Sequence, residues 1–206
     1  MSQAAAPAGG IVRTSLDATW RTPERLLDAV RTYFGGPIPL DPASGPDNPT
    51  QALRFFTGEV PSATPALRQE SLFGDWREHD ELARSRVNGL EQSWAPRFFV
   101  NPPYGRELRD WLAKMRDEAR ARSEGVALLP CARFEQGYFQ ETFGAASALC
   151  WIRGRVDFIS SIDGQAVRGN PYASMLLGFN ASWLRWRSAF GGLGACYQIG
   201  PGGGGW

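Results

Sequence analysis

Apolar residues recur at helical spacing in two stretches of the chain. The first stretch carries Leu26, Leu27, Val30, Tyr33 and Phe34 and stops at Gly35-Gly36. Thr22-Pro23-Glu24 is typical of a helix start, because Thr can cap, Pro fits the first helical position and Glu complements the dipole. The same spacing predicts a helix over residues 106–122. We expect a shorter helix over residues 135–143.

Short apolar runs that stop at turn-forming residues predict buried strands. These runs cover residues 37–40, 97–100, 126–129, 148–152, 155–159, 174–179 and 195–199. Strands and helices that alternate along a chain are typical of an α/β fold, in which helices flank a mainly parallel sheet. Ligands of such sheets lie beyond the carboxyl ends of the strands, where this sequence places Asp41 and Asn101.

The pattern predicts one folded domain over residues 18–199. Residues 59–96 interrupt it with prolines, mixed charges and weak periodicity, although a helical turn fits within residues 82–90. We expect a long, partly irregular insertion there. The Ala-, Gly- and Pro-rich residues 1–17 predict a disordered N-terminal tail, and the glycine-rich residues 200–206 predict a flexible C-terminal tail.

The composition is that of an ordinary soluble protein. Of the 206 residues, 43% are hydrophobic and 21% are charged. No apolar run approaches the roughly 20 residues that span a membrane. The N-terminus lacks the basic start and the apolar stretch of a signal peptide. We therefore expect a cytoplasmic protein without membrane attachment.

Histidine and cysteine are too scarce for the chemistry that they usually perform. The cysteines are Cys131, Cys150 and Cys196, with no close pair, and the single histidine is His79, in a polar segment. This pattern argues against a disulfide framework and against a metal site. It favours a reaction in which a cofactor carries the reactive group.

Asn101-Pro102-Pro103-Tyr104 directly follows an apolar strand and carries the most specific chemistry. The turn has the groups that methylation of an adenine amino group requires. The amino nitrogen of adenine is a poor nucleophile because its lone pair is delocalised into the ring. Two acceptors, the Asn oxygen and the carbonyl of the next proline, can hold both N–H groups, release the lone pair and stabilise the developing positive charge. The tyrosine ring can stack on a base that has left the helical stack. Asn and Pro also form plain turns, but the preceding strand favours the chemical interpretation.

A second turn, Leu40-Asp41-Pro42-Ala43-Ser44-Gly45, also follows an apolar run. It resembles the Asp-Pro-x-x-Gly cofactor-binding turn of amino-methyltransferases, in which Asp41 would attract the ammonium group of S-adenosylmethionine. Many methyltransferases carry a further glycine here, where this chain has Pro46-Asp47-Asn48.

In their order along the chain, the motifs resemble the phage-type DNA adenine-N6 methyltransferase family. The resemblance covers residues 18–180 and rests on Trp20-x-Thr22-Pro23, Leu40-Asp41-Pro42-Ala43, Asn88-Gly89-Leu90 with Trp94, Phe99 to Gly105, Trp111-x-x-Lys114 with Glu118-Ala119, Leu128-Leu129-Pro130 and Gly154-Arg155-Val156-x-Phe158. It implies a single-domain Rossmann-like methyltransferase fold. It also implies transfer of a methyl group from S-adenosylmethionine to the amino group of a flipped adenine in double-stranded DNA.

The resemblance assigns roles to individual residues. The target adenine would be bound and activated by Asn101, Pro102, Pro103 and Tyr104. The cofactor would be contacted by Trp20, Thr22, Pro23, Asp41, Pro42, Ala43 and Asn88. Asn88 stands where similar proteins usually carry Asp, so Glu59 and Asp75 are candidates for the missing carboxylate contact. Residues 59–96 would be a variable insertion or a target-recognition element.

The basic residues are almost all arginines in a chain of net charge +1, which is not the balance of a histone-like binder. Arginine suits phosphate contacts, although a GC-rich genome explains this usage equally well. Arg106, Arg133 and Arg155 are candidates for binding DNA phosphates or for structuring their loops. Solvated positions on the polar helix face are expected for Arg109, Arg116, Arg120 and Arg122.

Two other functions stay open. Methyltransferases that act on RNA or on protein glutamine amides are one alternative, because an amide nitrogen poses the same problem as an adenine amino group. The other is a non-catalytic DNA-binding relic, which fits the departure at Asn88 but not the intact Asn101 turn. The resemblance favours a site-specific enzyme of the restriction-modification type, encoded by a phage or prophage. We expect a monomer or weak dimer without a metal.

Overall fold

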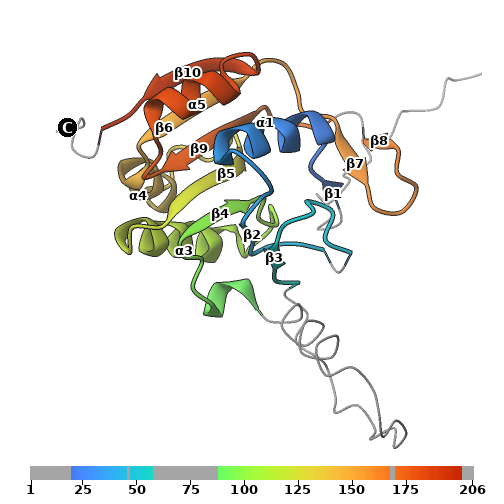
Figure 1. Ribbon diagram of the computed structural model, residues 1–206, viewed down its shortest axis with the longest axis horizontal. Helices are drawn as coiled ribbons and strands as arrows, with labels where there is room; N and C mark the ends of the chain where they lie inside the picture. The colour runs from blue at the N-terminus through green and yellow to red at the C-terminus, as the bar shows by residue number, and fades with distance from the viewer. Residues whose placement is uncertain (1–19, 46, 58–87, 168–169, 201–206) are drawn as a thin grey trace, which may run out of the picture.

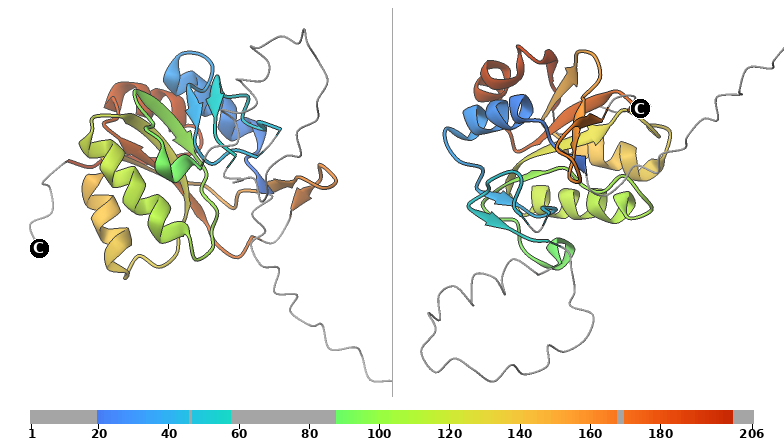
Figure 2. Two further views of the ribbon diagram at one scale, coloured as in Figure 1. Left: turned by 90° about the horizontal axis from the view of Figure 1, so that it is seen from below. Right: turned by 90° about the vertical axis from the view of Figure 1, so that its right-hand side faces the viewer.

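A five-stranded sheet with helices on both faces forms the body of the protein (Figure 1 and Figure 2). The computed structural model describes residues 20–45, 47–57, 88–167 and 170–200. The helices of this part are α1 (Glu24–Phe34), α3 (Leu108–Arg120), α4 (Gly137–Ala145) and α5 (Trp183–Phe190). α1 packs with α5 on one face of the sheet, and α3 packs with α4 on the other. These layers agree with the predicted α/β class.

The sheet has the strand order β10–β6–β9–β5–β4. Its strands are β4 (Arg97–Val100), β5 (Glu124–Pro130), β6 (Ala148–Ile152), β9 (Ser174–Phe179) and β10 (Gly194–Gln198). β4 and β5 pair in parallel, whereas the other three pairs of neighbours are antiparallel. The sheet is therefore mixed, which corrects the expectation of a mainly parallel sheet.

β9 is the cause of this difference. It lies between β5 and β6 and runs opposite to both, so β4, β5 and β6 share one direction. In the described part of the β6–β9 connection the chain forms a hairpin and no helix, so it turns back instead of crossing over. An apolar run does not reveal the direction of a strand, because a strand that is buried on both faces has the same apolar pattern in either direction.

Side chains of the strands alternate between the two helical layers. Phe99 and Val126 belong to the core under α1 and α5. Phe98 and Ala127 belong to the core against α3 and α4. Because both faces of the sheet are covered, the strands are continuous apolar runs rather than alternating ones.

The ends of α1 are set by local sequence. Gly35 adopts a φ of 74° and ends the helix in a left-handed turn, as predicted. Pro23 occupies the position before Glu24, and no side chain caps the helix. The expectation that Thr22 caps α1 is therefore wrong, and its hydroxyl is used elsewhere. α3 and α4 confirm the predicted helices with shifted ends.

Other elements differ from the sequence pattern. The predicted strand 37–40 is reduced to β2 (Leu40–Asp41), which pairs in parallel with β3 (Arg54–Phe55) and lies beside β4. The predicted strand 155–159 begins later, as β7 (Phe158–Ser160). The pattern does not predict β3, β8 (Ala166–Val167) or α5.

A small antiparallel sheet of order β1–β7–β8 lies beside the body, with β1 spanning Trp20–Arg21. β7 and β8 form a hairpin that stands clear of the main sheet (Figure 1 and the left view of Figure 2). No helix in the described ranges is long and apolar enough to cross a membrane. The predicted tails, apart from Gly200, and most of the insertion 59–96 lie outside the described residues.

Candidate active site

The Asn101-Pro102-Pro103-Tyr104 turn leaves the carboxyl end of β4, as predicted. Pro102 and Pro103 have no amide N–H, so strand pairing cannot continue through them. Pro102 is buried, and the other three residues of the turn are half-buried. The turn is thus held by the core on one side and accessible on the other.

Thr22 orients the side chain of Asn101. Nδ2 of Asn101 donates a hydrogen bond to Oγ1 of Thr22 at 3.2 Å, and Thr22 is 8% exposed. Oδ1 of Asn101 is buried and has no hydrogen-bond partner among the described residues. An unpaired buried acceptor costs about 1–3 kcal/mol. A ligand that brings an N–H group to this oxygen would recover that free energy.

An aromatic cluster lies beside Asn101. The rings of Tyr104 and Phe158 meet edge to face at 6.2 Å between centroids, and Trp20 stacks on Phe158 at 5.7 Å. The Tyr104 hydroxyl donates to the carbonyl oxygen of Leu128 at 3.4 Å. Burial raises the pKa of Tyr104 well above its usual range, so the phenol stays protonated and cannot act as a base near neutral pH.

Phe158 is a residue of this cluster to which sequence reasoning gives no separate role. It is 1% exposed and joins the rings of Trp20 and Tyr104. Its signal in the sequence is its place at the end of the Gly154–Phe158 segment, but an aromatic residue in an apolar run is also typical of a core. Trp20, whose role the sequence leaves open, lies half-buried at the edge of the cluster.

Asp41 ends β2 as a buried carboxylate that is 3% exposed. Oδ1 accepts the amide N–H of Ala43 at 3.0 Å, and Oδ2 accepts the hydroxyl of Thr50 at 2.8 Å. Burial raises the pKa of Asp41 to about 6, although both hydrogen bonds act to lower it. No lysine or arginine in the described ranges pairs with Asp41. The carboxylate is therefore suited to a cationic ligand.

The segment that begins at Asn88 lies directly against this turn. A Cβ on Gly89 would lie 2.0 Å from the carbonyl oxygen of Pro42. Oδ1 of Asn88 accepts the amide N–H of Leu90 at 3.0 Å, and its Nδ2 donates to Glu91 at 3.2 Å. Asn88 thus lies beside the predicted cofactor turn, but its side chain caps the 3-10 helix η1 (Gly89–Glu91).

The Asp41 turn and the Asn101 turn follow strands that lie side by side. β2 packs beside β4, so the Asp41 turn and the Asn101 turn lie close together. An ion pair between Arg21 and Asp47 ties β1 to the loop that follows Asp41. Pro23 and Pro42 are buried and Ala43 is half-buried. The structure thus gathers the residues predicted for the base and those predicted for the cofactor.

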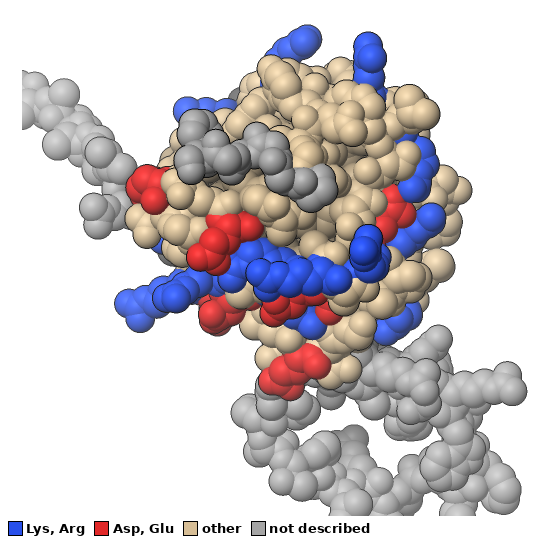
Figure 3. Space-filling model, turned by 90° about the vertical axis from the view of Figure 1, so that its left-hand side faces the viewer, with Lys and Arg blue, Asp and Glu red and all other residues tan. Residues whose placement is uncertain are grey.

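The arginines proposed for phosphate contacts differ in their surroundings. Arg106 and Arg133 are exposed. The guanidinium of Arg155 donates to the carbonyl oxygen of Asn170, a contact that favours the loop-structuring role for Arg155. On the face shown in Figure 3, a band of basic side chains crosses the middle and acidic side chains flank it on both sides.

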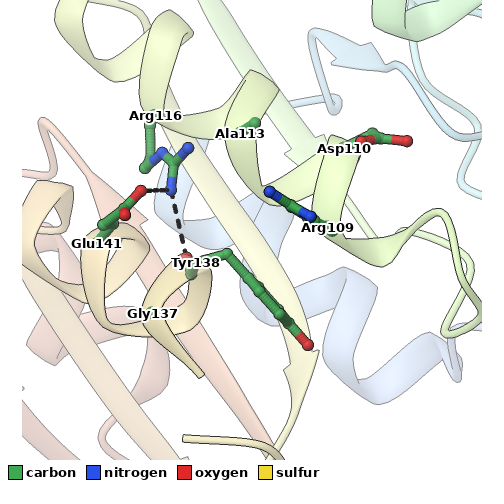
Figure 4. A pocket seen from close by; sticks show the side chains of 7 residues that line it. All are labelled: Arg109, Asp110, Ala113, Arg116, Gly137, Tyr138 and Glu141. Carbon is green, nitrogen blue, oxygen red and sulfur yellow. Dashed lines mark hydrogen bonds and ion pairs between the residues drawn. The ribbon is translucent and has the colours of Figure 1, made fainter. Parts of the chain in front are cut away.

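A shallow groove of about 600 Å³ lies between α3 and α4 (Figure 4). Its lining residues are Arg109, Asp110, Ala113, Arg116, Gly137, Tyr138 and Glu141. Arg116 donates to Glu141 and to the carbonyl oxygen of Tyr138, and its side chain is only 15% exposed. Arg116 therefore links the two helices, which corrects the expectation of a solvated side chain. The groove contains none of the predicted site residues.

Some predictions concern residues that the structure leaves undescribed. These are Glu59, Asp75, His79 and the rest of residues 59–87. Within the described ranges, no three His, Cys, Asp or Glu side chains are grouped so as to hold a metal ion.

Comparison with known proteins adds one match. The family model described as DNA N-6-adenine-methyltransferase (Dam) matches residues 80–190, which is more than half of the 206-residue chain. The matched segment contains the Asn101–Tyr104 turn and Phe158, whereas Thr22 and Asp41 precede it. A search of curated proteins finds no match.

Proposed function

The chain belongs to the DNA N-6-adenine-methyltransferase (Dam) family, and we propose that it transfers a methyl group from S-adenosylmethionine to the amino group of a flipped adenine in double-stranded DNA. The observation that carries this proposal is the amide of Asn101. Its nitrogen is held by Thr22, and its buried oxygen lacks a partner among the described residues. That oxygen can accept a hydrogen bond from an N–H group of a ligand.

Asn101 would accept one amino proton of adenine through Oδ1, and the carbonyl of Pro102 would accept the other. Both hydrogen bonds localise the nitrogen lone pair and stabilise positive charge that develops as the new bond forms. Because Thr22 already holds Nδ2, the amide does not have to rotate when the base arrives. The side chain is therefore preorganised for the transition state.

The aromatic cluster would receive the base itself. Tyr104 and Trp20 are half-buried, and Phe158 lies fully buried between their rings. A flipped base is held by stacking on side chains of this kind, which repays part of the cost of unstacking it. The raised pKa of Tyr104 argues against a role as general base.

The residues around Asp41 fit the proposed cofactor. Asp41 is buried, accepts two hydrogen bonds and has no cationic partner in the described part of the chain, so it suits the ammonium group of the methionine moiety. Pro42, Ala43 and Asn88 would line the same turn, where Gly89 packs on Pro42. S-adenosylmethionine, when bound, supplies a methyl group on a sulfonium that leaves as a neutral thioether.

The first experiment is methyl transfer from labelled S-adenosylmethionine to unmethylated duplex DNA, with nucleoside analysis of the product. N6-methyladenine is the expected product. Asn101→Ala should lower the rate by about a hundredfold or more while cofactor affinity stays near that of the wild type. Gln140→Ala, at an exposed amide on α4, is the matched control and should be fully active.

The same experiment separates the alternatives. Labelled RNA or protein amides without labelled DNA would replace the proposal by another amino-group methylation. Cofactor binding without any methylated product, or no cofactor binding at all, would favour the DNA-binding relic. Full activity of Asn101→Ala would exclude the mechanism and leave the family assignment untouched.

A further inference from the structure

Two of the three free cysteines lie opposite each other in the main sheet. Cys150 is the middle residue of β6, Cys196 is the middle residue of β10, and the two are partners in the register of this antiparallel pair. Partners of this kind point their side chains to the same face of a sheet. Accordingly, Cys150 is buried in the core under α1 and α5, and Cys196 packs half-buried against the same core. The two cysteines are far apart in the sequence, so their spacing does not reveal the pair.

Hydrogen bonds at the two ends of the β6–β10 ladder show which kind of pair the cysteines form. Just beyond one end, the amide of Ile199 donates to the carbonyl oxygen of Ser147 at 3.0 Å. Just beyond the other end, the amide of Arg153 donates to the carbonyl oxygen of Leu193 at 2.9 Å. Hydrogen-bonded and non-hydrogen-bonded pairs alternate along an antiparallel ladder. The cysteine pair lies an odd number of residues from each end and is therefore a non-hydrogen-bonded pair.

This kind of pair suits a disulfide bond. The Cα atoms of a non-hydrogen-bonded pair are about 4.5 Å apart, and the side chains approach more closely than in a hydrogen-bonded pair. A disulfide spans Cα distances of about 4.4–6.8 Å. Among the described strands, β10 pairs only with β6 and lies at the edge of the sheet (Figure 1). It can therefore adjust its position without disturbing a second neighbour.

Cys196 is the more reactive thiol of the pair. It is half-buried, whereas Cys150 is fully buried. Burial raises the pKa of both thiols, but the Cys150 thiol and the positive charge of Arg187 act to lower the pKa of Cys196. The two sulfur atoms are thus close enough to affect each other. Because the described part of β10 has a single neighbouring strand, local opening of the edge gives a small reagent access to Cys196.

We propose that Cys150 and Cys196 are a modification site, at which a small-molecule disulfide oxidises the two thiols to a bond that fastens β10 to β6. The Cys196 thiolate attacks one sulfur of the reagent, which yields a mixed disulfide and releases one reagent thiolate. The Cys150 thiolate then attacks the Cys196 sulfur, so that the bond between the cysteines forms and the second reagent thiolate leaves. The released thiolates take up the two cysteine protons. The cysteine sulfurs lose two electrons in total, and the reagent gains them.

The bond would act on stability. It closes a loop that contains Phe158, β9 and α5, and it therefore restricts the unfolded chain. β9 and β5 separate β6 from β4, so the cysteine pair lies away from the Asn101 turn. A reducing compartment keeps such a pair as thiols, so the protein would gain this stability only under oxidising conditions. The site does not depend on the proposed function.

The test treats the purified protein with glutathione disulfide and maps disulfide bonds by mass spectrometry of unreduced peptides. We expect a bond between Cys150 and Cys196 and a rise in Tm of about 5–10 °C, which dithiothreitol should reverse. Cys196→Ser and Cys196→Ala should form no such bond and should show the same Tm in oxidised and reduced samples. Cys131→Ser is the matched control, because it removes a half-buried thiol outside the pair. It should form the bond as readily as the wild type.

Free thiols at Cys150 and Cys196 after this treatment, or glutathione adducts that persist on either residue, would overturn the proposal. A disulfide between two molecules through Cys131, in place of the pair, would overturn it as well. A bond that forms without raising Tm would show that it does not fasten β10. Methyl transfer is not measured here, so a failure of this proposal and a failure of the proposed function are recognised separately.

Discussion

Thr22 and Asn101 are 79 residues apart in the sequence, yet Nδ2 of Asn101 donates to the Thr22 hydroxyl across 3.2 Å. In this arrangement the amide nitrogen faces Thr22, and the amide oxygen has no partner in the described structure. Thr22 can serve in this way because α1 begins at Glu24 without a side-chain cap. The residue that looks like a helix cap in the sequence is, in the structure, a positioning residue for Asn101.

Thr22→Val should therefore lower kcat for methyl transfer by about tenfold, the equivalent of one lost hydrogen bond. The substitution keeps the shape of the side chain and removes its acceptor, so the amide of Asn101 is free to rotate. Thr22→Ser, which keeps the hydroxyl, should keep most of the activity. A Thr22→Val enzyme with wild-type kcat in steady-state assays would contradict this role.

The affinity for S-adenosylmethionine should depend on the ionisation of Asp41. The pKa of Asp41 is raised to about 6 by burial, and only the ionised form attracts an ammonium group. Binding in calorimetric titrations should weaken as the pH is lowered from about 7 to about 5. Asp41→Asn should bind more weakly and show no inflection over this range. A pH dependence that persists in Asp41→Asn would have to come from another group.

The raised pKa of Asp41 also predicts how the free energy of unfolding depends on pH. The dependence has the opposite sign to that expected for a salt-bridged carboxylate. Because the folded protein binds the Asp41 proton more tightly than the unfolded chain, the free energy of unfolding should fall as the pH rises through about 6. The change from 3.8 to about 6 corresponds to a loss of about 3 kcal/mol. Denaturant unfolding of the cofactor-free protein should show this loss, and Asp41→Asn should lack it.

Gly89→Ala should damage the Asp41 turn, the proposed cofactor-binding turn. The new Cβ would lie 2.0 Å from the carbonyl oxygen of Pro42, a backbone atom that cannot move without shifting the Asp41 turn. We expect a loss of stability of about 1–3 kcal/mol and a weaker affinity for S-adenosylmethionine. Gly144→Ala on α4 is the matched control, since its Cβ meets nothing within 4 Å and alanine favours a helix. An unchanged affinity in Gly89→Ala would separate η1 from the cofactor site.

The parts of the site that the sequence predicts are those with local signals. The Asn101 and Asp41 turns each follow an apolar run, and proline and glycine chemistry mark where the strands stop. The Thr22–Asn101 hydrogen bond and the Tyr104–Phe158 contact join residues far apart in the sequence. Such contacts are products of tertiary packing and leave no periodic trace.

The errors in the predicted fold also come from tertiary packing and from chain connections. The reversed direction of β9 depends on a connection that folds back as a hairpin, which an apolar run cannot signal. α5 does carry a local signal, because Ser182 precedes Trp183, Trp186 and Phe190 at helical spacing. Its three bulky residues suit a strand as well as a helix, and packing against α1 decides for the helix.

Arg106 provides a test of how the enzyme holds the DNA backbone. It is exposed, follows the Asn101–Tyr104 turn and forms no ion pair with any residue that the structure describes. A phosphate of the strand that carries the flipped adenine would pass close to such a residue. Each phosphate contact releases counterions, so Arg106→Ala should weaken DNA binding uniformly across sequences and reduce the slope of log K against log salt by about 1.

Arg120→Ala is the matched control for this measurement. Arg120 is an exposed arginine at the last residue of α3, where it pairs with Asp117. Arg106 lies shortly before the first residue of the same helix. It belongs to a helix face on which charges of both signs alternate, so its loss should leave the salt dependence of DNA binding unchanged. If fluorescence anisotropy gave the same slope for Arg106→Ala and the wild type, Arg106 would be a solvated side chain. If Arg120→Ala reduced the slope instead, the DNA would have to run across α3 and away from the Asn101 turn.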